Sequence, residues 1–292
     1  MIINYLSNAI VKGGQAPVFD NPGKHGLTYE EVSFKASDGV NLSGWLINGG
    51  TEKIIIQSHY GVQSSRSGYT PEGKGMGKMW KEDISFLKHA SYLVAKGYSI
   101  LMYDFRNHGN SDVGTCPWVS WGPEEHKDVL AAVDFVANHP MYKESQIGLL
   151  SICMGAASST YAFGKKDGLK SYSNIKAMVA IQPLRYADFI TALGLNNFIG
   201  RMVTKRNEKR TQIDLTHTSF MPDVKEINVP TLLVQNSNDE YLNRQSIEEY
   251  YEALQVDKDL LWLDLDKKRA AGYDYLTRNP EKILHWFDKY MN

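Results

Sequence analysis

Short hydrophobic runs alternate with longer amphipathic stretches along most of the 292-residue chain. On both sides of Asp38-Gly39, hydrophobic residues alternate with polar ones, a pattern typical of an antiparallel hairpin. The later runs are compact and almost wholly apolar, as expected for parallel strands that are buried on both faces. These runs are 54–56, 99–103, 147–150, 178–181, 231–234 and 260–263. They predict a mostly parallel sheet that follows an opening hairpin.

Helical patterns lie between several of the runs, at 84–95, 125–137 and 247–254. The alternation of strands and helices predicts an α/β protein in which helices cover both faces of a mostly parallel central sheet. The segment 186–223 breaks this alternation because it is long for a single crossover connection. We therefore expect a small helical cap insertion at 186–223, with the core formed by 1–185 and 224–292.

The expected cap contains a cluster of basic residues that has two interpretations. The cluster consists of Arg201, Lys205, Arg206, Lys209 and Arg210. It forms either the solvent-exposed face of a helix or a basic rim that attracts an anionic substrate to a site beneath the cap.

Composition narrows the classes of partner and the expected compartment. The net charge of -1 provides no field that would steer the chain to nucleic acid or to anionic lipid. No apolar run approaches the roughly 20 residues that span a bilayer, and the first residues lack the pattern of a secretory signal. The two cysteines, Cys116 and Cys153, show no spacing that requires a disulfide. We expect a cytoplasmic protein that acts on a small molecule, without a cofactor, a metal, a nucleic acid or a membrane as partner; the pattern does not predict the oligomeric state.

Cys153 lies where a nucleophile elbow would be expected. It follows a predicted buried strand in Ser151-Ile152-Cys153-Met154-Gly155 and precedes a predicted helix that is rich in small residues. An elbow of the G-x-S-x-G type needs small neighbours because its nucleophile occupies a strained turn between strand and helix. The dipole at the start of that helix favours the thiolate form of a cysteine. The alternative is a buried structural cysteine, which packs like a small hydrophobic residue.

The order of four segments resembles that of the α/β-hydrolase superfamily, from about residue 32 to the end of the chain. These are the loop at His59, the loop at Asp104, the elbow at Cys153 and the strand end at Asp239. The stretch from Asp104 to Ser111 is similar to the D-x-R-G-H-G-x-S loop of that superfamily, and its charged residues are expected to be structural. A cysteine nucleophile is also found in dienelactone hydrolases of the superfamily.

This resemblance implies roles for individual residues. Asp239 matches the acid of the catalytic triad. The backbone N–H of Met154 is expected in the oxyanion hole together with that of Tyr60 or Gly61, two alternatives that the sequence leaves open.

The sequence departs from the superfamily pattern at the triad histidine. That histidine should follow the last strand, 260–263, but the next residues contain Lys267, Lys268 and Arg269 instead. We place Lys268 at the expected histidine position, so the triad is Cys–(Lys or Arg)–Asp or incomplete. His285 is expected on the solvent face of the terminal helix, which argues against it as the catalytic base. An uncharacterised branch of α/β-hydrolase-like proteins looks similar, with a cysteine elbow, basic residues and a G-Y-x-Y segment, here residues 272–275.

Three hypotheses about function follow. The first is an enzyme that acts on a small ester, lactone or thioester through Cys153, by acyl transfer or by slow hydrolysis, because deacylation by water needs a base. The second is a catalytically impaired protein that binds a small acidic ligand or a partner. In the third, His59, His108 or His126 reaches Cys153 from an unusual place.

Overall fold

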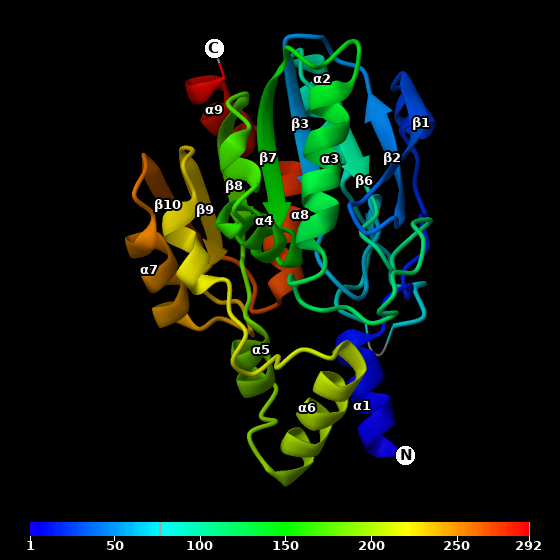
Figure 1. The fold of residues 1–292 in the computed structure, drawn as a ribbon, viewed down its shortest axis with the longest axis vertical. Coiled ribbons are helices and arrows are strands. Elements are labelled where there is room, and N and C mark those ends of the chain that lie inside the picture. The colour runs from blue at the N-terminus through cyan, green and yellow to red at the C-terminus, as the bar shows by residue number, and fades with distance from the viewer. Residues whose placement is uncertain (76–77, 292) are drawn as a thin grey trace.

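Eight strands form one sheet in the part of the chain that the computed structural model describes, residues 1–75 and 78–291. Strands β1 and β2 pair antiparallel with each other, β2 pairs antiparallel with β6, and all later pairs are parallel (Figure 1). The spatial order is β1 (Tyr29–Lys35), β2 (Asn41–Ile47), β6 (Ser99–Tyr103), β3 (Lys53–Ser58), β7 (Gln146–Ile152), β8 (Ile175–Ile181), β9 (Thr231–Asn236) and β10 (Lys258–Leu263). This arrangement confirms the predicted fold class and the opening hairpin.

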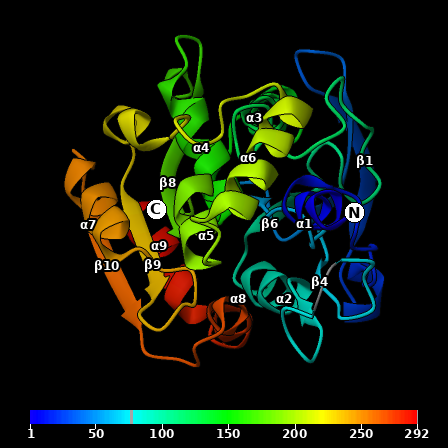
Figure 2. The ribbon, with the colours of Figure 1, turned by 90° about the horizontal axis from the view of Figure 1, so that it is seen from below.

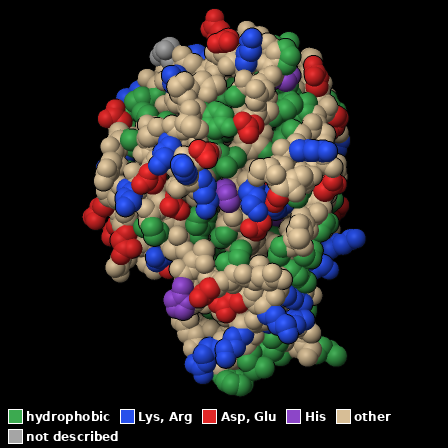
Figure 3. Space-filling model, in the orientation of Figure 1, with side chains coloured by type: hydrophobic (Ala, Val, Ile, Leu, Met, Phe, Trp, Pro, Cys, Tyr) green, Lys and Arg blue, Asp and Glu red, His purple; other side chains and the backbone are tan. Residues whose placement is uncertain are grey.

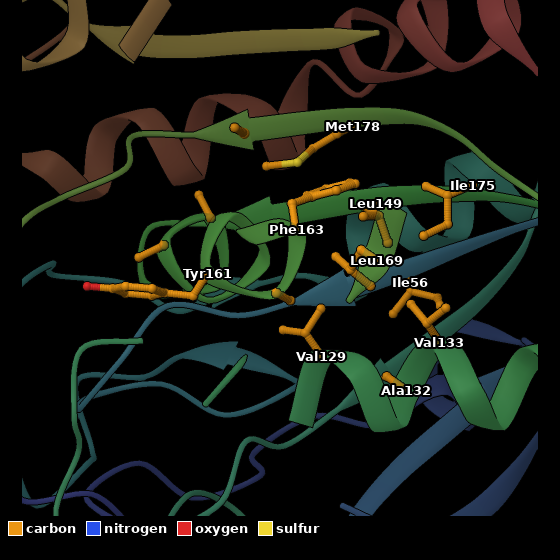
Figure 4. Close-up of a cluster of buried hydrophobic side chains, with 14 of the residues drawn as sticks. Ile56, Val129, Ala132, Val133, Leu149, Tyr161, Phe163, Leu169, Ile175 and Met178 are labelled. Carbon is orange, nitrogen blue, oxygen red and sulfur yellow. The ribbon is translucent and has the colours of Figure 1, made fainter. Parts of the chain in front are cut away.

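Helices cover both faces of the sheet and enclose two apolar clusters. One face carries α3 (His126–Asn138), α4 (Met154–Gly164) and α7 (Arg244–Ala253). The other carries α2 (Leu87–Ala95), α8 (Arg269–Arg278) and α9 (Glu281–Tyr290). Figure 4 shows the first cluster, in which Val129 and Val133 of α3 lie opposite Ile56 and Leu149 of the sheet. The central strands are buried on both sides, which explains their continuous apolar runs.

The remaining short elements complete the layers. A two-stranded ribbon pairs β4 with β5, and short 3-10 turns connect larger elements. They are β4 (Gly68–Tyr69), β5 (Ile84–Ser85), η1 (Pro22–His25), η2 (Leu169–Ser171) and η3 (Met221–Glu226). In α9, Ile283 and Phe287 are buried whereas His285 is exposed, as the helical periodicity predicts.

Three helices stand away from the sheet, at the edge where the parallel strands end (Figures 1 and 2). Two of them, α5 (Tyr186–Ala192) and α6 (Phe198–Thr211), lie within the expected cap segment. The third is α1 (Ile2–Val11), which packs against α6. Ile10 and Val11 share an apolar cluster with residues of α5 and α6, and Arg210 donates a 2.9 Å hydrogen bond to the Asn8 side chain.

The position of α1 differs from the expected division, which assigned the whole of 1–185 to the core. The apolar face of α1 is evident in its sequence, but the pattern carries no information about which surface it covers. At the other end, η3 packs against α4 of the core although it begins at Met221. Below, "cap" denotes α1, α5, α6 and the connections at 193–197 and 212–220. Across the described residues, none of the helices combines the length and the apolar character that crossing a bilayer requires.

Candidate active site

Cys153 occupies a strained turn between β7 and α4. Its backbone has φ 54° and ψ -103°, a region that residues with a side chain rarely adopt. Its N–H donates a 2.8 Å hydrogen bond to the carbonyl of Ile181, which fixes the turn to β8. Close packing explains Gly155, since a Cβ there would lie 2.4 Å from the backbone oxygen of Ser58. The expected strand–turn–helix arrangement around Cys153 is therefore present.

Cys153 lies in the wall of a cavity of about 220 Å³ between the core and the cap. The core end of this cavity is polar, whereas the cap contributes apolar side chains. Residues of the core end include Tyr60, Gly61, Met154, Arg269 and Tyr273, and those of the cap are Ala9, Ile10 and Phe189. The cap therefore closes over the same edge of the sheet on which Cys153 lies.

Arg269 lies between Asp239 and Cys153. Asp239 follows β9 at the same sheet edge as Cys153, and its carboxylate forms a short ion pair with the Arg269 guanidinium. Both side chains of this pair are almost completely buried. Arg269 also donates to the Tyr273 hydroxyl over 2.8 Å and to the carbonyl of Gln182. Arg269 and Tyr273 line the same cavity as Cys153, and both interact electrostatically with its side chain.

The structure corrects the assignment of Lys268 to the histidine position. Lys268 pairs with Glu240 over 2.8 Å, and its side chain remains 56% exposed at the edge of the cavity. Helix α8 begins at Arg269, so Lys268 is the residue before the helix and lies at the exposed edge of the cavity beside Glu240. It is Arg269 that faces inward. The choice between the two basic residues depended on a helix boundary that the sequence does not define.

The titration behaviour of these groups follows from burial and from their neighbours. Burial lowers the pKa of Arg269, but the charge of Asp239, with Tyr273 and Cys153, outweighs burial and holds that pKa well above its ordinary value. Burial raises the pKa of Tyr273 well above its ordinary value, although Arg269 opposes this shift. Burial and the neighbouring Tyr273 also raise the pKa of Tyr60 well above its ordinary value. At neutral pH the site therefore presents a guanidinium cation and two neutral phenols.

The three histidines considered as bases are occupied elsewhere. His59 donates from Nδ1 to the Tyr60 carbonyl over 2.6 Å and accepts at Nε2 from the Phe105 N–H. His108 donates from Nδ1 to the Arg106 carbonyl and accepts at Nε2 from the Val62 N–H. Burial lowers the pKa of His59 and of His108, which keeps both rings neutral.

His126 bonds through Nδ1 to the Pro123 carbonyl over 2.6 Å, and burial lowers its pKa to about 4. Among the described residues that line the cavity there is no histidine. The hypothesis of a histidine reaching Cys153 from an unusual place therefore finds no support. Asp104 pairs with Arg66 over 2.6 Å and accepts from the Asn110 N–H, which agrees with a structural role for its loop.

The candidate oxyanion-hole residues gather around Cys153. Tyr60, Gly61 and Met154 line the same end of the cavity. A Cβ at Gly61 would lie 2.8 Å from the Met154 sulfur, so the two segments approach closely. The Met154 N–H is in the first turn of α4, where a helix offers no acceptor of its own.

Two further features of the site were not predicted from the sequence. The Tyr60 ring stacks on that of Tyr273 with centroids 4.9 Å apart, and α1 contributes to the cavity wall. The G-Y-x-Y segment was a signal for the first of these, because it contains Tyr273. Gly272 of that segment is required for packing, since a Cβ there would lie 2.4 Å from the Gln182 side chain. The described residues contain no group of three or more His, Cys, Asp or Glu placed to hold a metal ion.

Comparison with known proteins identifies the fold through structure. No family model and no curated protein matches the sequence. An esterase from Pyrococcus furiosus superposes with a TM-score of 0.68 and 23% identity, covering 94% of this chain and 96% of that chain. An α/β-hydrolase from Penicillium sp. sh18 gives 0.64 and 16% identity over 90% and 99% of the two chains. The chain has the α/β-hydrolase fold.

A third similar structure extends this likeness to a larger protein. The acylaminoacyl peptidase of Pyrococcus horikoshii superposes with a TM-score of 0.63 and 16% identity, covering 94% of this chain but 44% of that chain. Likeness at these identities establishes the α/β-hydrolase fold, and the chemistry of this chain is argued from its own residues.

Proposed function

We propose that this α/β-hydrolase-fold chain is an enzyme that forms an acyl-thioester on Cys153. The Cys153 sulfur attacks the carbonyl carbon of a small ester, lactone or thioester, and the bond from that carbon to the leaving group breaks. The leaving alkoxide or thiolate takes up the proton that the thiol has lost, directly or through water. The acyl group then passes to a better nucleophile than water, or is hydrolysed slowly.

The strained backbone of Cys153 is the observation that carries this proposal. A non-glycine residue in such a conformation costs about 1–3 kcal/mol and persists where the surrounding structure enforces it, most often at functional sites. A cysteine that served only to fill space would gain nothing from this turn. Cys153 also lines a cavity, where a substrate carbonyl can approach its sulfur.

The surroundings of Cys153 suit the first half of the reaction better than the second. The N-terminus of α4, the Arg269 guanidinium and the N–H groups near Tyr60 and Gly61 offer positive charge where an oxyanion develops. Arg269 keeps its proton at any working pH and cannot take one from water. Deacylation by water therefore lacks the general-base help that is typically worth about 10²–10⁴-fold in rate.

The alternative is a catalytically impaired protein that binds a small acidic ligand or a partner. Arg269 supplies a buried cation for such a ligand, but Asp239 offsets part of its charge, and a free acid would lack the covalent bond that holds an oxyanion at Cys153. The ion pair thus weighs against a strong anion site, and we favour the enzyme.

Intact mass spectrometry after exposure to p-nitrophenyl acetate tests the proposal. We expect a mass increase of one acetyl group on the native protein, slow loss of that group in water, and no increase in Cys153→Ala. Cys116→Ala is the matched control, because it removes the other cysteine of the chain and should still acylate. An adduct that persists in Cys153→Ala would refute the proposal. No adduct at all, with small carboxylic acids raising the unfolding temperature, would favour the alternative.

A further inference from the structure

Exposed hydrophobic side chains gather at one end of the cap. Phe198 is 68% exposed, and most other large hydrophobic side chains that the described residues expose lie on α1, on α6 or just before α6. These cap residues are Ile2, Tyr5, Leu193, Phe198, Ile199 and Met202; Met1 directly precedes α1, and Val113 and Met141 lie elsewhere. Both α1 and α6 begin at the end of the cap that is farthest from the sheet (Figure 1). Contiguous apolar surface of this kind marks an interaction site in a folded protein.

Basic residues follow the hydrophobic ones along the exposed side of α6. Lys205 and Lys209 continue the stripe that begins with Phe198 and Met202, at helical spacing. Figure 3 shows hydrophobic and basic side chains next to each other at this end of the molecule. Among the described residues, Arg201, Lys205 and Lys209 form no ion pair; they are exposed, and none of the three lines the cavity. The second interpretation of the basic cluster, a rim around the site, therefore lacks support.

We propose that the cap docks on an anionic lipid surface through this apolar end. A helix rises 1.5 Å per residue, so Lys205 lies about 10 Å and Lys209 about 16 Å along the axis from Phe198. Apolar faces of interfacial helices enter a bilayer by about 5–10 Å, to the boundary of headgroups and acyl chains. With the axis of α6 along the bilayer normal and Phe198 about 10 Å deep, Met202 lies about 4 Å deep, Lys205 lies near the bilayer surface, and Lys209 lies about 6 Å above it, where both lysines can meet lipid headgroups. Hydrophobic insertion and attraction to negative charge then act together.

The charges favour a lipid surface over a second copy of the chain. A symmetric dimer through this end would bring two sets of unpaired lysines and arginines together, at a cost in repulsion. The overall net charge of -1 does not reveal the basic charge of the cap, because acidic residues elsewhere offset the basic cluster. This proposal departs from the expectation, drawn from composition, that a membrane is not a partner. The inference does not depend on chemistry at Cys153.

Flotation with lipid vesicles tests the docking surface. We expect the native chain to float with phosphatidylcholine vesicles that contain about 30% phosphatidylserine, less with phosphatidylcholine alone, and less in high salt. Phe198→Ser with Met202→Ser should lower binding about tenfold or more, as should Lys205→Glu with Lys209→Glu. Matched controls are Val113→Ser with Met141→Ser and Lys35→Glu with Lys88→Glu, which change exposed residues outside the cap and should bind like the native chain.

Two results would overturn this inference. One is vesicle binding that is absent in the native chain or equal in all variants. The other is a native dimer in lipid-free sedimentation that Phe198→Ser with Met202→Ser converts to a monomer, since this would assign the surface to a second copy. The unfolding midpoints of the cap and control variants should be equal, so that a loss of vesicle binding cannot be attributed to unfolding.

Discussion

Arg269 holds the carboxylate of Asp239 and contacts the nucleophile candidate, as a histidine would in a complete triad. It differs from histidine in proton chemistry. An imidazole exchanges its proton near neutral pH, whereas a guanidinium remains charged throughout. The arrangement can therefore stabilise negative charge near Cys153 but cannot activate water. Substitutions of Arg269 can therefore test charge stabilisation and water activation separately.

Arg269→His is expected to accelerate hydrolysis of the acyl-enzyme, because a histidine can activate water. Asp239 would remain beside residue 269 to orient the imidazole, so a Cys–His–Asp set would form. We expect steady-state hydrolysis of p-nitrophenyl acetate to rise about 10²-fold, the lower end of what general-base help provides. The lifetime of the acetyl adduct on Cys153, followed by intact mass spectrometry, should decrease by a similar factor.

Lys268→His is the matched control for this substitution. It introduces the same side chain one residue earlier, at an exposed position beside Glu240, and should leave hydrolysis unchanged. A gain in Lys268→His without a gain in Arg269→His would show that Lys268 faces the nucleophile. No gain in a folded Arg269→His would show that the missing base does not limit turnover.

The sequence could place Cys153 and Asp239 at the ends of strands, and could show that no histidine follows the last strand, because these positions are fixed relative to apolar runs. It could not decide between Lys268 and Arg269. A shift of one residue in the start of a helix rotates each side chain by about 100°, and no capping residue marks the start of α8. The ion pair with Asp239 resolves the choice, because burying an unpaired carboxylate is costly.

At the scale of elements, the turn from β7 to α4 stores strain in order to expose one side chain. Glycine tolerates φ 54° and ψ -103° far better than any residue with a Cβ. We expect Cys153→Gly to be more stable than Cys153→Ala, by about 1–2 kcal/mol. Both variants lose the thiol, so the comparison isolates the backbone. Urea unfolding at neutral pH measures the difference.

The sign of this effect distinguishes the strained turn from ordinary structure. At an ordinary helical position the order of stability should be the reverse. At exposed Lys209 of α6, for example, the Lys209→Gly variant should be less stable than Lys209→Ala by about 1 kcal/mol. If Cys153→Gly were also the less stable of its pair, the turn would hold no strain. The observation on which the proposed nucleophile rests would then be lost.

Elements differ in how far the sequence predicts them. The parallel strands are evident because burial on both faces makes them continuous apolar runs, as in β6. Helix α1 has an apolar face as well, but its partner α6 lies about 200 residues later, at a separation that the Ser7–Asn207 hydrogen bond illustrates. Local patterns carry no information about such a contact. The contribution of α1 to the roof of the cavity, through Ala9 and Ile10, therefore emerged only from the fold.

At the scale of the whole molecule, the packed core keeps several histidines neutral. His59 and His108 bond to the backbone of Tyr60 and Val62, which line the cavity, and His89 of α2 packs against the sheet through Gln57. Burial lowers the pKa of His89 to about 3 and that of His126 to about 4. An unfolded chain exposes these rings to water, where an ordinary histidine has a pKa of about 6.5. Folding thus releases protons in mildly acidic solution.

This linkage predicts loss of stability in mild acid. Below pH 6.5 the unfolded chain binds protons that the folded chain excludes, so the unfolding free energy falls as the pH drops toward the folded pKa values. His89 alone should remove about 2 kcal/mol between pH 8 and pH 5. In His89→Gln, whose amide can still donate to Gln57, that portion of the pH dependence should vanish in urea titrations. His285→Gln, at an exposed position, is the control that should leave the native slope. An unchanged slope in His89→Gln would mean that His89 is protonated equally in both states, and that its burial does not exclude the charged form.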